Sequence, residues 1–435
     1  MSSSIAGSNV LFLTQVLPYP LSSGAKIRAY YMLRYLAQHY RVTLVSFVRE
    51  DDRPEYVEHL QYYCHDVHTV RMQRSTFKDI RSLLEGLMGK KPAVIARDRK
   101  PAMLRLLRQL VKRTEYAVVH ADQTSMAQYG LFAARTATNS PAMLLDQHNA
   151  MHLLVARQAA HERGWRQRIW QREARLLRKY ETGLLRQYSH ILTVTEEDTN
   201  ALGQLLPPAE QPAFFERHST LPICVDPASQ PMVEQWDEGH HILHLGTMFW
   251  PPNIEGVLWF AREVLPRILN EIPDARFTIA GKNPPAAVKA LAERGSLVAG
   301  HVEVTGFVPD PAPLLRRSRV FVVPFWAGGG MRVKILDGWQ WGVPIVSTPI
   351  GAEGILCQPG ENILLADDAD TFANAVVRVM RDRSLARQLR DSGRRWVEAQ
   401  YNWRTVYPKL DSIYGALCDS QTKNSQSHEA LASTQ

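Results

Sequence analysis

Short, nearly continuous apolar runs alternate along the chain with longer stretches in which apolar residues recur at helical spacing. In the first half the runs that predict strands are Val10–Thr14, Arg41–Phe47, Ala117–His120, Ala142–Asp146 and His190–Val194. In the second half they are His241–Leu245, Arg276–Ala280, His301–Thr305, Arg319–Pro324, Pro344–Ser347 and Asn362–Leu365. Strands that are apolar on both faces are typical of parallel sheets covered by helices. The alternation therefore predicts an α/β fold with two parallel sheets.

One helical stretch in the second half shows the pattern most clearly. Apolar residues between Val257 and Leu269 recur on one helix face, and Asn253 is a suitable N-cap residue for that helix. Pro266 lies inside the same stretch. Because proline has no backbone N–H to donate, we expect the helix to be kinked or divided there.

The length of 435 residues suits two domains rather than one. The proline-rich segment Leu206–Glu238 predicts a mostly irregular linker between them. We therefore expect domains at residues 1–225 and 226–400, followed by a helix at 401–420 that returns to the first domain. Residues 421–435 are rich in polar residues and are expected to be a disordered tail.

Composition narrows the class of protein. No apolar stretch is long enough to span a bilayer, no charged segment precedes the first apolar run, and the four cysteines are scattered. These features predict a cytoplasmic protein with reduced thiols. The net charge of +8 is uneven, with 29 Lys+Arg against 18 Asp+Glu in residues 1–200. The first half is therefore expected to face an anionic partner, such as a membrane surface or a phosphorylated substrate.

A glycine-rich loop is the strongest candidate for a ligand site. The apolar run Val320–Pro324 leads into three consecutive glycines, and a helix is expected to start near Met331. Arg332 and Lys334 add two positive charges at that helix start. Glycines let the backbone approach a ligand, and a helix N-terminus favours an anion. The loop residues that we expect to contact a phosphate-containing ligand are Gly328, Gly329, Gly330 and Met331.

Asp337 has two interpretations. It lies three residues after Lys334, so the two side chains share a helix face. Asp337 could accept hydrogen bonds from ribose hydroxyls, or it could form an ion pair with Lys334. Spacing alone favours the ion pair.

This stretch resembles the donor-binding segment of retaining glycosyltransferase family 4, which has the GT-B fold of two Rossmann-like domains facing across a cleft. The similarity extends over the second half and is greatest to sugar transferases of bacterial exopolysaccharide gene clusters. The motifs that carry it are Gly246-Thr247-Met248 with Pro252-Asn253, Ala280-Gly281, Thr305–Asp310, Lys334–Asp337, Gly342-Val343-Pro344 and Gly351–Gly354.

The resemblance implies roles for several residues. Arg332 and Lys334 would neutralise the donor diphosphate, Phe307 and Val308 would lie near the nucleotide base, and Gly246 and Asn253 would border the donor site. Many family members carry two glutamates eight positions apart, where this chain has Gly329 and Asp337. That departure puts the sugar and ribose contacts of these two positions in doubt.

The first half contributes a second set of candidates. The loop before Gly24 resembles the first loop of the same family, which reaches toward donor and acceptor, although an ordinary strand–helix turn explains it equally well. Asp146-Gln147-His148-Asn149 follows a predicted strand and resembles an Asp-x-His-Asn segment of this subtype. We expect His148 to act in catalysis and Asn149 to bind substrate. His120, at the end of another predicted strand, is a weaker candidate for binding.

The resemblance implies an enzyme that transfers a sugar, with retention, from a nucleotide-sugar donor to a saccharide or lipid-linked acceptor. No metal or other cofactor is expected, because the sequence shows no acidic metal-binding cluster. The alternatives are a nucleotide-sugar epimerase of the same fold, a non-catalytic nucleotide-sugar-binding homologue and, least of all, a nucleic-acid binder. Residues 151–190 carry 9 Lys+Arg against 3 Asp+Glu, interleaved with Trp165, Trp170 and leucines. This pattern predicts either a core-packed helix with a basic face or a helix that rests on an anionic membrane.

Overall fold

The computed structural model describes residues 7–72, 91–233, 239–248, 250–326 and 330–419. The chain divides into two compact units, of which unit 1 comprises residues 1–224 and 406–435 and unit 2 comprises residues 225–405. The predicted tail at 421–435 lies outside the described residues.

Unit 1 is built on a parallel sheet of seven strands in the order β3-β2-β1-β4-β5-β6-β7. The strands are β1 (Asn9–Thr14), β2 (Arg41–Val48), β3 (Asp66–Arg71), β4 (Val118–Asp122), β5 (Ala142–Gln147), β6 (His190–Thr193) and β7 (His218–Thr220). The central strands are buried on both faces, which explains their continuous apolar runs. All five strands predicted in this half are present.

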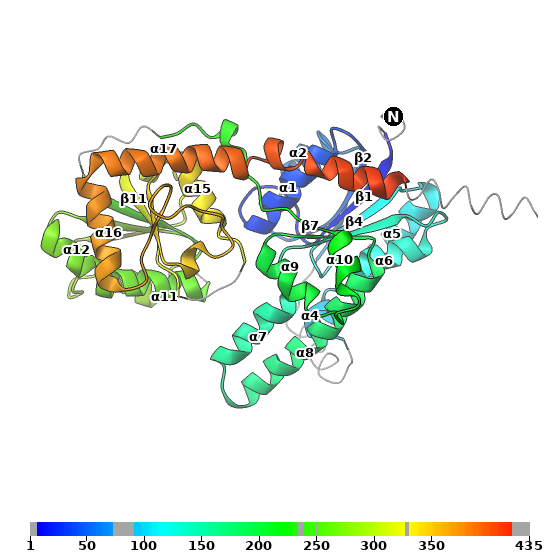
Figure 1. Ribbon diagram of the computed structural model, residues 1–435, viewed down its shortest axis with the longest axis horizontal. Coiled ribbons are helices and arrows are strands. Elements are labelled where there is room, and N and C mark those ends of the chain that lie inside the picture. Colours follow the sequence, from blue (N-terminus) through cyan, green and yellow to red (C-terminus); the bar gives the residue numbers. More distant parts are fainter. Residues whose placement is uncertain (1–6, 73–90, 234–238, 249, 327–329, 420–435) are drawn as a thin grey trace, which may run out of the picture. The chain divides into compact units, whose positions relative to one another are not determined.

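Helices cover this sheet, and two of them form a hairpin that extends from the unit (Figure 1). The hairpin consists of α7 (Met151–His161) and α8 (Gly164–Gln187). The remaining helices are α1 (Gly24–Leu36), α2 (Pro54–Gln61), α4 (Ala93–Arg97), α5 (Pro101–Arg113), α6 (Ala127–Thr136), α9 (Glu196–Gly203) and α10 (Gln211–Glu216). After α18 (Trp403–Val406), residues 409–419 form a further helix that belongs to unit 1.

Unit 2 repeats the same strand order with six parallel strands, β10-β9-β8-β11-β12-β13. They are β8 (His241–Leu245), β9 (Arg276–Ala280), β10 (Val302–Gly306), β11 (Ser318–Val323), β12 (Ile345–Ser347) and β13 (Leu364–Leu365). The helices are α11 (Pro251–Trp259), α12 (Leu265–Glu271), α13 (Ala286–Lys289), α14 (Ala312–Arg317), α15 (Val333–Trp341), α16 (Ala369–Arg381) and α17 (Arg383–Gln400). Short 3-10 turns are η1 (Pro227–Ser229), η3 (Ala290–Ala292) and η4 (Ile350–Ala352). All six strands predicted in this half are present.

The helical stretch after residue 250 is divided as expected. A π-helical turn, η2 (Phe260–Val264), separates α11 from α12 and ends just before Pro266. The N-cap prediction for Asn253 is wrong, because α11 already begins at Pro251. Asn253 instead lies in the first turn, where its side chain is free to reach other elements.

Two elements of unit 1 escaped prediction because their sequences lack the apolar runs of central strands. β3 is an edge strand with a largely exposed face, and β7 has the sequence His-Ser-Thr. β7 and α10 both lie in the proline-rich segment, so the mostly irregular linker predicted for Leu206–Glu238 is wrong in its first part. β7 gains its structure by pairing with β6, which local sequence does not reveal.

Within the described part of the chain, no helix combines the length and the apolar character needed to cross a membrane. No disulfide joins Cys64, Cys224, Cys357 and Cys418, all of which lie in the described part of the chain.

Candidate ligand sites at the strand ends

The strand order reverses beside the first strand of each sheet, between β1 and β4 in unit 1 and between β8 and β11 in unit 2. Open parallel sheets bind ligands outside the carboxyl ends of their strands at such a reversal. Most of the predicted site residues of unit 2 follow β8 and β11, so they lie at this position, whereas Phe307 and Val308 follow the edge strand β10. The Asp122 and Asp146 carboxylates and His148 lie at the equivalent strand ends of unit 1.

Lys334 is the centre of the unit 2 site. Its Nζ donates to Asn253 Oδ1 at 3.0 Å, and Asn253 Nδ2 donates to the Thr247 carbonyl at 2.7 Å. A Cβ on Gly246 would lie only 2.8 Å from Lys334 Nζ. A side chain at 246 would therefore push the ammonium group away from this position, whereas glycine leaves room for it.

Arg332 lies beside this group as the N-cap residue of α15. Its guanidinium and the Lys334 ammonium lie over the ring of buried Phe325, at 5.5 and 4.3 Å from the ring centre. The Glu353 carboxylate lies 4.0 Å from the Arg332 guanidinium. Two positive side chains therefore sit at a helix N-terminus, an arrangement that attracts an anion.

Burial shifts the protonation of the residues on α15. Burial and the neighbouring Arg332 charge together lower the pKa of Lys334 to about 7, while Asp337 opposes that shift. Burial also raises the pKa of Asp337 to about 6, while Lys334 opposes that shift. Within the described residues, the ion pairs include none between Lys334 and Asp337, although spacing alone favoured one. The carboxyl of Asp337 is thus available for another partner.

His244 was not predicted from sequence, yet it borders the same space. Its Nε2 would lie 3.1 Å from a Cβ on Gly246. His244 Nδ1 lies 2.9 Å from the Val322 carbonyl and must therefore carry the proton. Burial and the Lys334 charge lower the pKa of His244 well below its ordinary value. The neutral ring leaves a buried Nε2 acceptor without a hydrogen-bond partner among the described residues.

The other predicted residues of unit 2 are placed as follows. Gly330 has a φ of 77°, a conformation that favours glycine, and the helix begins at Val333 rather than near Met331. Phe307 is 67% exposed at the end of β10, next to the half-buried Val308. Gly328 and Gly329 lie outside the described residues.

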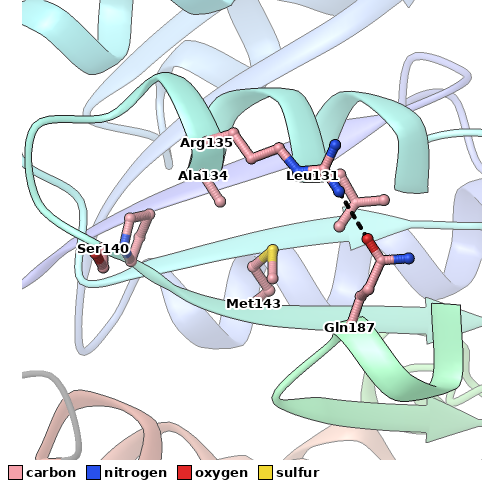
Figure 2. A pocket seen from close by; sticks show the side chains of 7 residues that line it. Leu131, Ala134, Arg135, Ser140, Met143 and Gln187 are labelled. Atoms are coloured by element: carbon pink, nitrogen blue, oxygen red, sulfur yellow. Dashed lines mark hydrogen bonds between the residues drawn. The ribbon is translucent and has the colours of Figure 1, made fainter. Parts of the chain in front are cut away.

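Unit 1 has a shallow hollow of about 240 Å³ at the amino end of β5 (Figure 2). Its polar groups include Arg135, which donates to Gln187 Oε1 at 2.8 Å. The hollow lies at the opposite end of the strand from the predicted site residues. Its lining residues include no carboxylate, histidine or cysteine, so we assign it no role.

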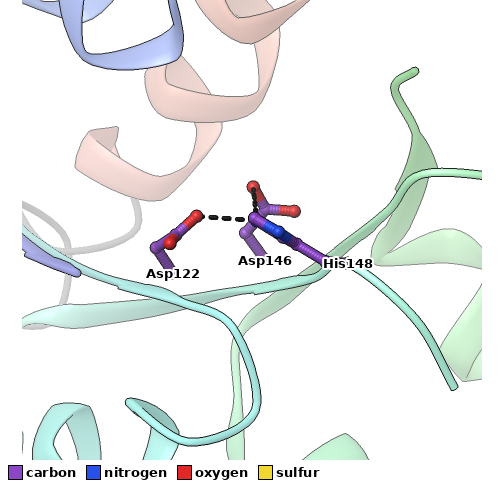
Figure 3. Close-up of side chains that lie close together, drawn as sticks. All are labelled: Asp122, Asp146 and His148. Atoms are coloured by element: carbon purple, nitrogen blue, oxygen red, sulfur yellow. Dashed lines mark hydrogen bonds and ion pairs between the residues drawn. The ribbon is translucent and has the colours of Figure 1, made fainter. Parts of the chain in front are cut away.

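The carboxyl ends of β4 and β5 carry a buried charged network (Figure 3). Asp122 and Asp146 are register partners on adjacent strands, and His148 Nε2 lies 2.7 Å from Asp122 Oδ1. Arg28 from α1 donates to both oxygens of Asp146 at 2.7 Å. Sequence analysis identified His148 but missed Arg28 and Asp122. Arg28 lies within the predicted first helix, and its full burial is a tertiary property.

The two carboxylates and His148 could in principle hold a metal ion, since their ligand atoms lie within 4.8 Å of one another. This acidic cluster was not predicted, because the strands bring together residues that lie far apart in the chain. However, Arg28 occupies both oxygens of Asp146 with a fixed positive charge. These side chains are therefore better suited to the Arg28 guanidinium than to a metal ion.

The structure corrects the position of His120. β4 continues to Asp122, so His120 does not end the strand but lies fully buried within it. His120 Nδ1 contacts Tyr414 Oη at 2.6 Å, and burial lowers the pKa of His120 to about 3. In this environment the ring is neutral and has no access to a ligand. Gly24 is the first residue of α1, and Asn149 is half-buried after β5.

The fold is GT-B. Over 94% of the chain and 100% of the other protein, the structure resembles that of HepE from Anabaena, solved in complex with UDP and glucose. The TM-score is 0.62 and the sequence identity is 12%, so this similarity concerns the fold alone.

Sequence comparisons find one family model within unit 2 and relatives that match part of the chain. Residues 239–382 match the family model described as "Glycosyl transferases group 1". An uncharacterized 44.6 kDa protein in the cps region of Klebsiella pneumoniae is 25% identical over 175 residues, which is 39% of this chain and 45% of that protein. The GDP-mannose-dependent alpha-(1-6)-phosphatidylinositol monomannoside mannosyltransferase of Mycobacterium tuberculosis is 30% identical over 156 residues, or 34% of this chain and 40% of that enzyme. The chain thus matches less than half the length of these curated relatives.

Proposed function

We propose that this protein is a glycosyltransferase that moves a sugar from a nucleotide-diphosphate sugar to a saccharide or lipid-linked acceptor in glycan biosynthesis. The observation that carries the proposal is the Lys334 ammonium, held by Asn253 against Gly246 beside Arg332 at the start of α15. Such a pair suits the diphosphate of a nucleotide-sugar. The group 1 family match over the same residues and the mannosyltransferase relative support this assignment.

In the proposed reaction the bond between the sugar C1 and the diphosphate oxygen breaks, and a bond from C1 to an acceptor hydroxyl oxygen forms. The diphosphate leaves with the bonding electron pair, and the acceptor proton is released to it or to water. Arg332 and Lys334 stabilise the charge that develops on the leaving diphosphate. The family resemblance implies retention of configuration at C1, no metal ion, Asp337 on the ribose and the Phe307–Val308 segment beside the base.

A donor screen followed by a product assay tests this function. At 100 times its dissociation constant, a bound nucleoside diphosphate adds about 2.7 kcal/mol to folding stability and raises the Tm. With the donor that binds, transfer requires an acceptor, whereas an epimerase converts the donor without one. Turnover of the donor without acceptor would support the epimerase, and binding without turnover toward any acceptor would support a non-catalytic homologue.

We further propose that the α7–α8 hairpin rests on an anionic membrane on the cytoplasmic side, where a lipid-linked acceptor would be found. The base of the hairpin packs in the core through Leu177, Leu184 and Leu185. Toward the other end of α8, Trp165 is 71% exposed and Trp170 is 36% exposed. Exposed basic residues surround them, namely Arg166, Arg168, Arg175 and Arg178. Exposed tryptophan and arginine on one helix are typical of segments that bind the membrane interface.

Co-sedimentation with liposomes tests the membrane proposal. Binding to vesicles with anionic lipid should exceed binding to neutral vesicles and should fall as salt rises, because each basic residue near the surface contributes about 1 kcal/mol. Trp165→Ser should weaken binding, whereas Trp250→Ser, a control at an exposed tryptophan of unit 2, should not. Equal binding to both kinds of vesicle, or none at low salt, would remove this proposal and leave the transferase untouched.

A further inference from the structure

Arg28, Asp122, Asp146 and His148 form a compact network in unit 1 that the proposed reaction does not yet use. Arg28, Asp122 and Asp146 are fully buried, and the His148 side chain keeps 9% of its surface exposed. His148 is therefore the member through which the network can reach a ligand. Figure 3 shows its ring beside both carboxylates.

The contacts of His148 define which ring nitrogen carries a proton. Nε2 lies 2.7 Å from Asp122 Oδ1 and 3.7 Å from Asp146 Oδ2. Both neighbours are hydrogen-bond acceptors, so Nε2 must donate. Nδ1 makes no hydrogen bond to the residues that the structure describes, and it is not among their fully buried polar atoms that lack a partner. This second nitrogen is the one available to a bound molecule.

Charge balance decides whether Nδ1 also carries a proton. The Arg28 guanidinium pairs with both oxygens of Asp146, which leaves Asp122 with His148 as its partner. Burial raises the pKa of Asp122, and the His148 charge opposes that shift. A neutral ring would therefore leave the buried carboxylate without a counter-charge, which is costly. Burial alone would lower the pKa of His148, but the Asp122 and Asp146 carboxylates together outweigh burial and raise the pKa of His148 to about 9, with Asp122 making the larger contribution.

The groups that face the network from other elements do not supply a competing charge. Burial lowers the pKa of His120 to about 3, so this ring is neutral at physiological pH. Burial raises the pKa of Tyr407 and of Tyr414 well above the ordinary value, so both are neutral hydroxyls. The cations of the network are therefore Arg28 and protonated His148.

The backbone donors at the start of α7 already have partners. The N–H of Ala150 donates to Asp198 at 2.7 Å, and the N–H of Met151 donates to Glu181 at 2.9 Å. Protein carboxylates thus occupy the N-terminus of α7. A ligand oxygen at this strand end would meet His148 Nδ1 rather than the helix terminus.

We propose that Asp122 is a positioning residue that fixes the ring of His148 and keeps it doubly protonated, so that its Nδ1–H is a charged donor to a hydroxyl or phosphate oxygen of the substrate. His148 then acts as a binding cation and not as a general base. This inference rests on the proposed transferase function for its biological role, but the protonation state of His148 can be measured without turnover.

The direct test is an NMR titration of the full chain with ¹³C-labelled histidine side chains, in which His148→Gln assigns the His148 signal. In the unaltered protein His148 should titrate near pH 9. Asp122→Asn keeps the shape and a hydrogen-bonding oxygen but removes the charge, so the His148 pKa should fall by about 1–3 units. Asp274→Asn is the matched control, because it removes the carboxylate beside exposed His240 and should leave His148 unchanged.

Activity supplies a second readout that a purely structural role would not move. In the unaltered enzyme kcat, which reports the bound complex in which the diphosphate keeps Lys334 charged, should decline as the pH rises through about 9. In Asp122→Asn this decline should move to lower pH by the same interval as the His148 pKa, with activity recovering at acidic pH where His148 regains its proton. If Asp122 had only a structural role, Asp122→Asn would lower the activity by the same factor at every pH.

Titration of His148 near its ordinary value of 6.5 in the unaltered protein would overturn the inference. An unchanged His148 pKa in folded Asp122→Asn would overturn it as well. If Asp122→Asn does not fold, the titration of the unaltered protein decides alone. A protein without transferase activity but with a high His148 pKa would refute the proposed function and retain the assignment of charge.

Discussion

Both units carry charged residues at the carboxyl ends of their strands, but the charges are neutralised differently in the two units. In unit 1 Arg28 pairs with both oxygens of Asp146, and His148 pairs with Asp122, so the four charges cancel within the protein. In unit 2 the Lys334 ammonium is held by neutral Asn253, and Arg332 lies beside it with Glu353 at 4.0 Å.

The difference shows in the effect of burial on the basic groups. Burial and the Arg332 charge lower the pKa of Lys334 to about 7. The surroundings of Lys334 therefore disfavour its positive charge. A bound diphosphate would relieve that cost, whereas in unit 1 the Asp122 carboxylate already stabilises the charge of His148 without a ligand. The unit 2 site is thus suited to bind an anionic ligand. The unit 1 network orients a single hydrogen-bond donor, His148 Nδ1–H.

The largest effect is expected for Lys334→Ala. Loss of an electrostatic stabiliser of the leaving group should lower kcat/KM by about 100-fold or more. Steady-state kinetics at saturating acceptor would measure it, with Lys289→Ala as a control at an exposed lysine of α13. Equal kinetics for a folded Lys334→Ala protein and the unaltered enzyme would rule out the unit 2 site.

Asp337→Asn should separate binding from stability. If Asp337 accepts hydrogen bonds from ribose, the change should weaken nucleoside diphosphate binding by about 1–3 kcal/mol in a calorimetric titration. An effect on binding below about 1 kcal/mol would instead assign Asp337 a structural role.

The same change should alter stability in a pH-dependent way. Burial raises the pKa of Asp337 to about 6, so the folded protein favours the neutral carboxyl. The contribution of this group to stability is therefore complete below its ordinary pKa and is lost as the pH rises through about 6. Asp337→Asn should raise the Tm at pH 8 and give a smaller gain at pH 5. A Tm gain independent of pH would contradict the assignment.

Gly246→Ala should have a moderate effect. The added Cβ would lie 2.8 Å from Lys334 Nζ and 3.0 Å from Asn253 Nδ2, so the ammonium must move. We expect diphosphate binding to weaken about tenfold, or about 1.4 kcal/mol. Gly183→Ala is the matched control, since its Cβ would meet only Gln187 Nε2 at an ordinary 3.8 Å. Equal binding by the two variants would show that the position of Lys334 does not matter.

Chelation should have the smallest effect. Arginine, lysine and a helix N-terminus take the place of a cation at the diphosphate, so activity should persist in excess EDTA. The same measurement tests whether the cluster of Asp122, Asp146 and His148 binds a metal ion, which the positive charge of Arg28 disfavours. Loss of activity that magnesium or manganese restores would contradict both the role of Arg332 and Lys334 in unit 2 and the exclusion of a metal ion from the unit 1 cluster.

The sequence by itself determined the α/β architecture and the candidate site of unit 2. Strands buried on both faces leave continuous apolar runs, so all eleven predicted strands are present, whereas edge strands β3 and β7 leave no such signal. Arg332, Lys334 and Gly246 were identified because short motifs around them carry the family resemblance and local chemistry.

Only the tertiary structure decided the network of unit 1 and the environment of Lys334. Asp122 and Asp146 are 24 positions apart in the chain yet are register partners. Arg28, which donates to Asp146, lies 118 positions before it in the chain. His244 joins the unit 2 site through β8, 90 positions before Lys334 in the sequence. Periodicity and local motifs report which face of an element is buried. They do not report which charges burial brings together, and those pairings set the protonation of His148, Lys334 and Asp337.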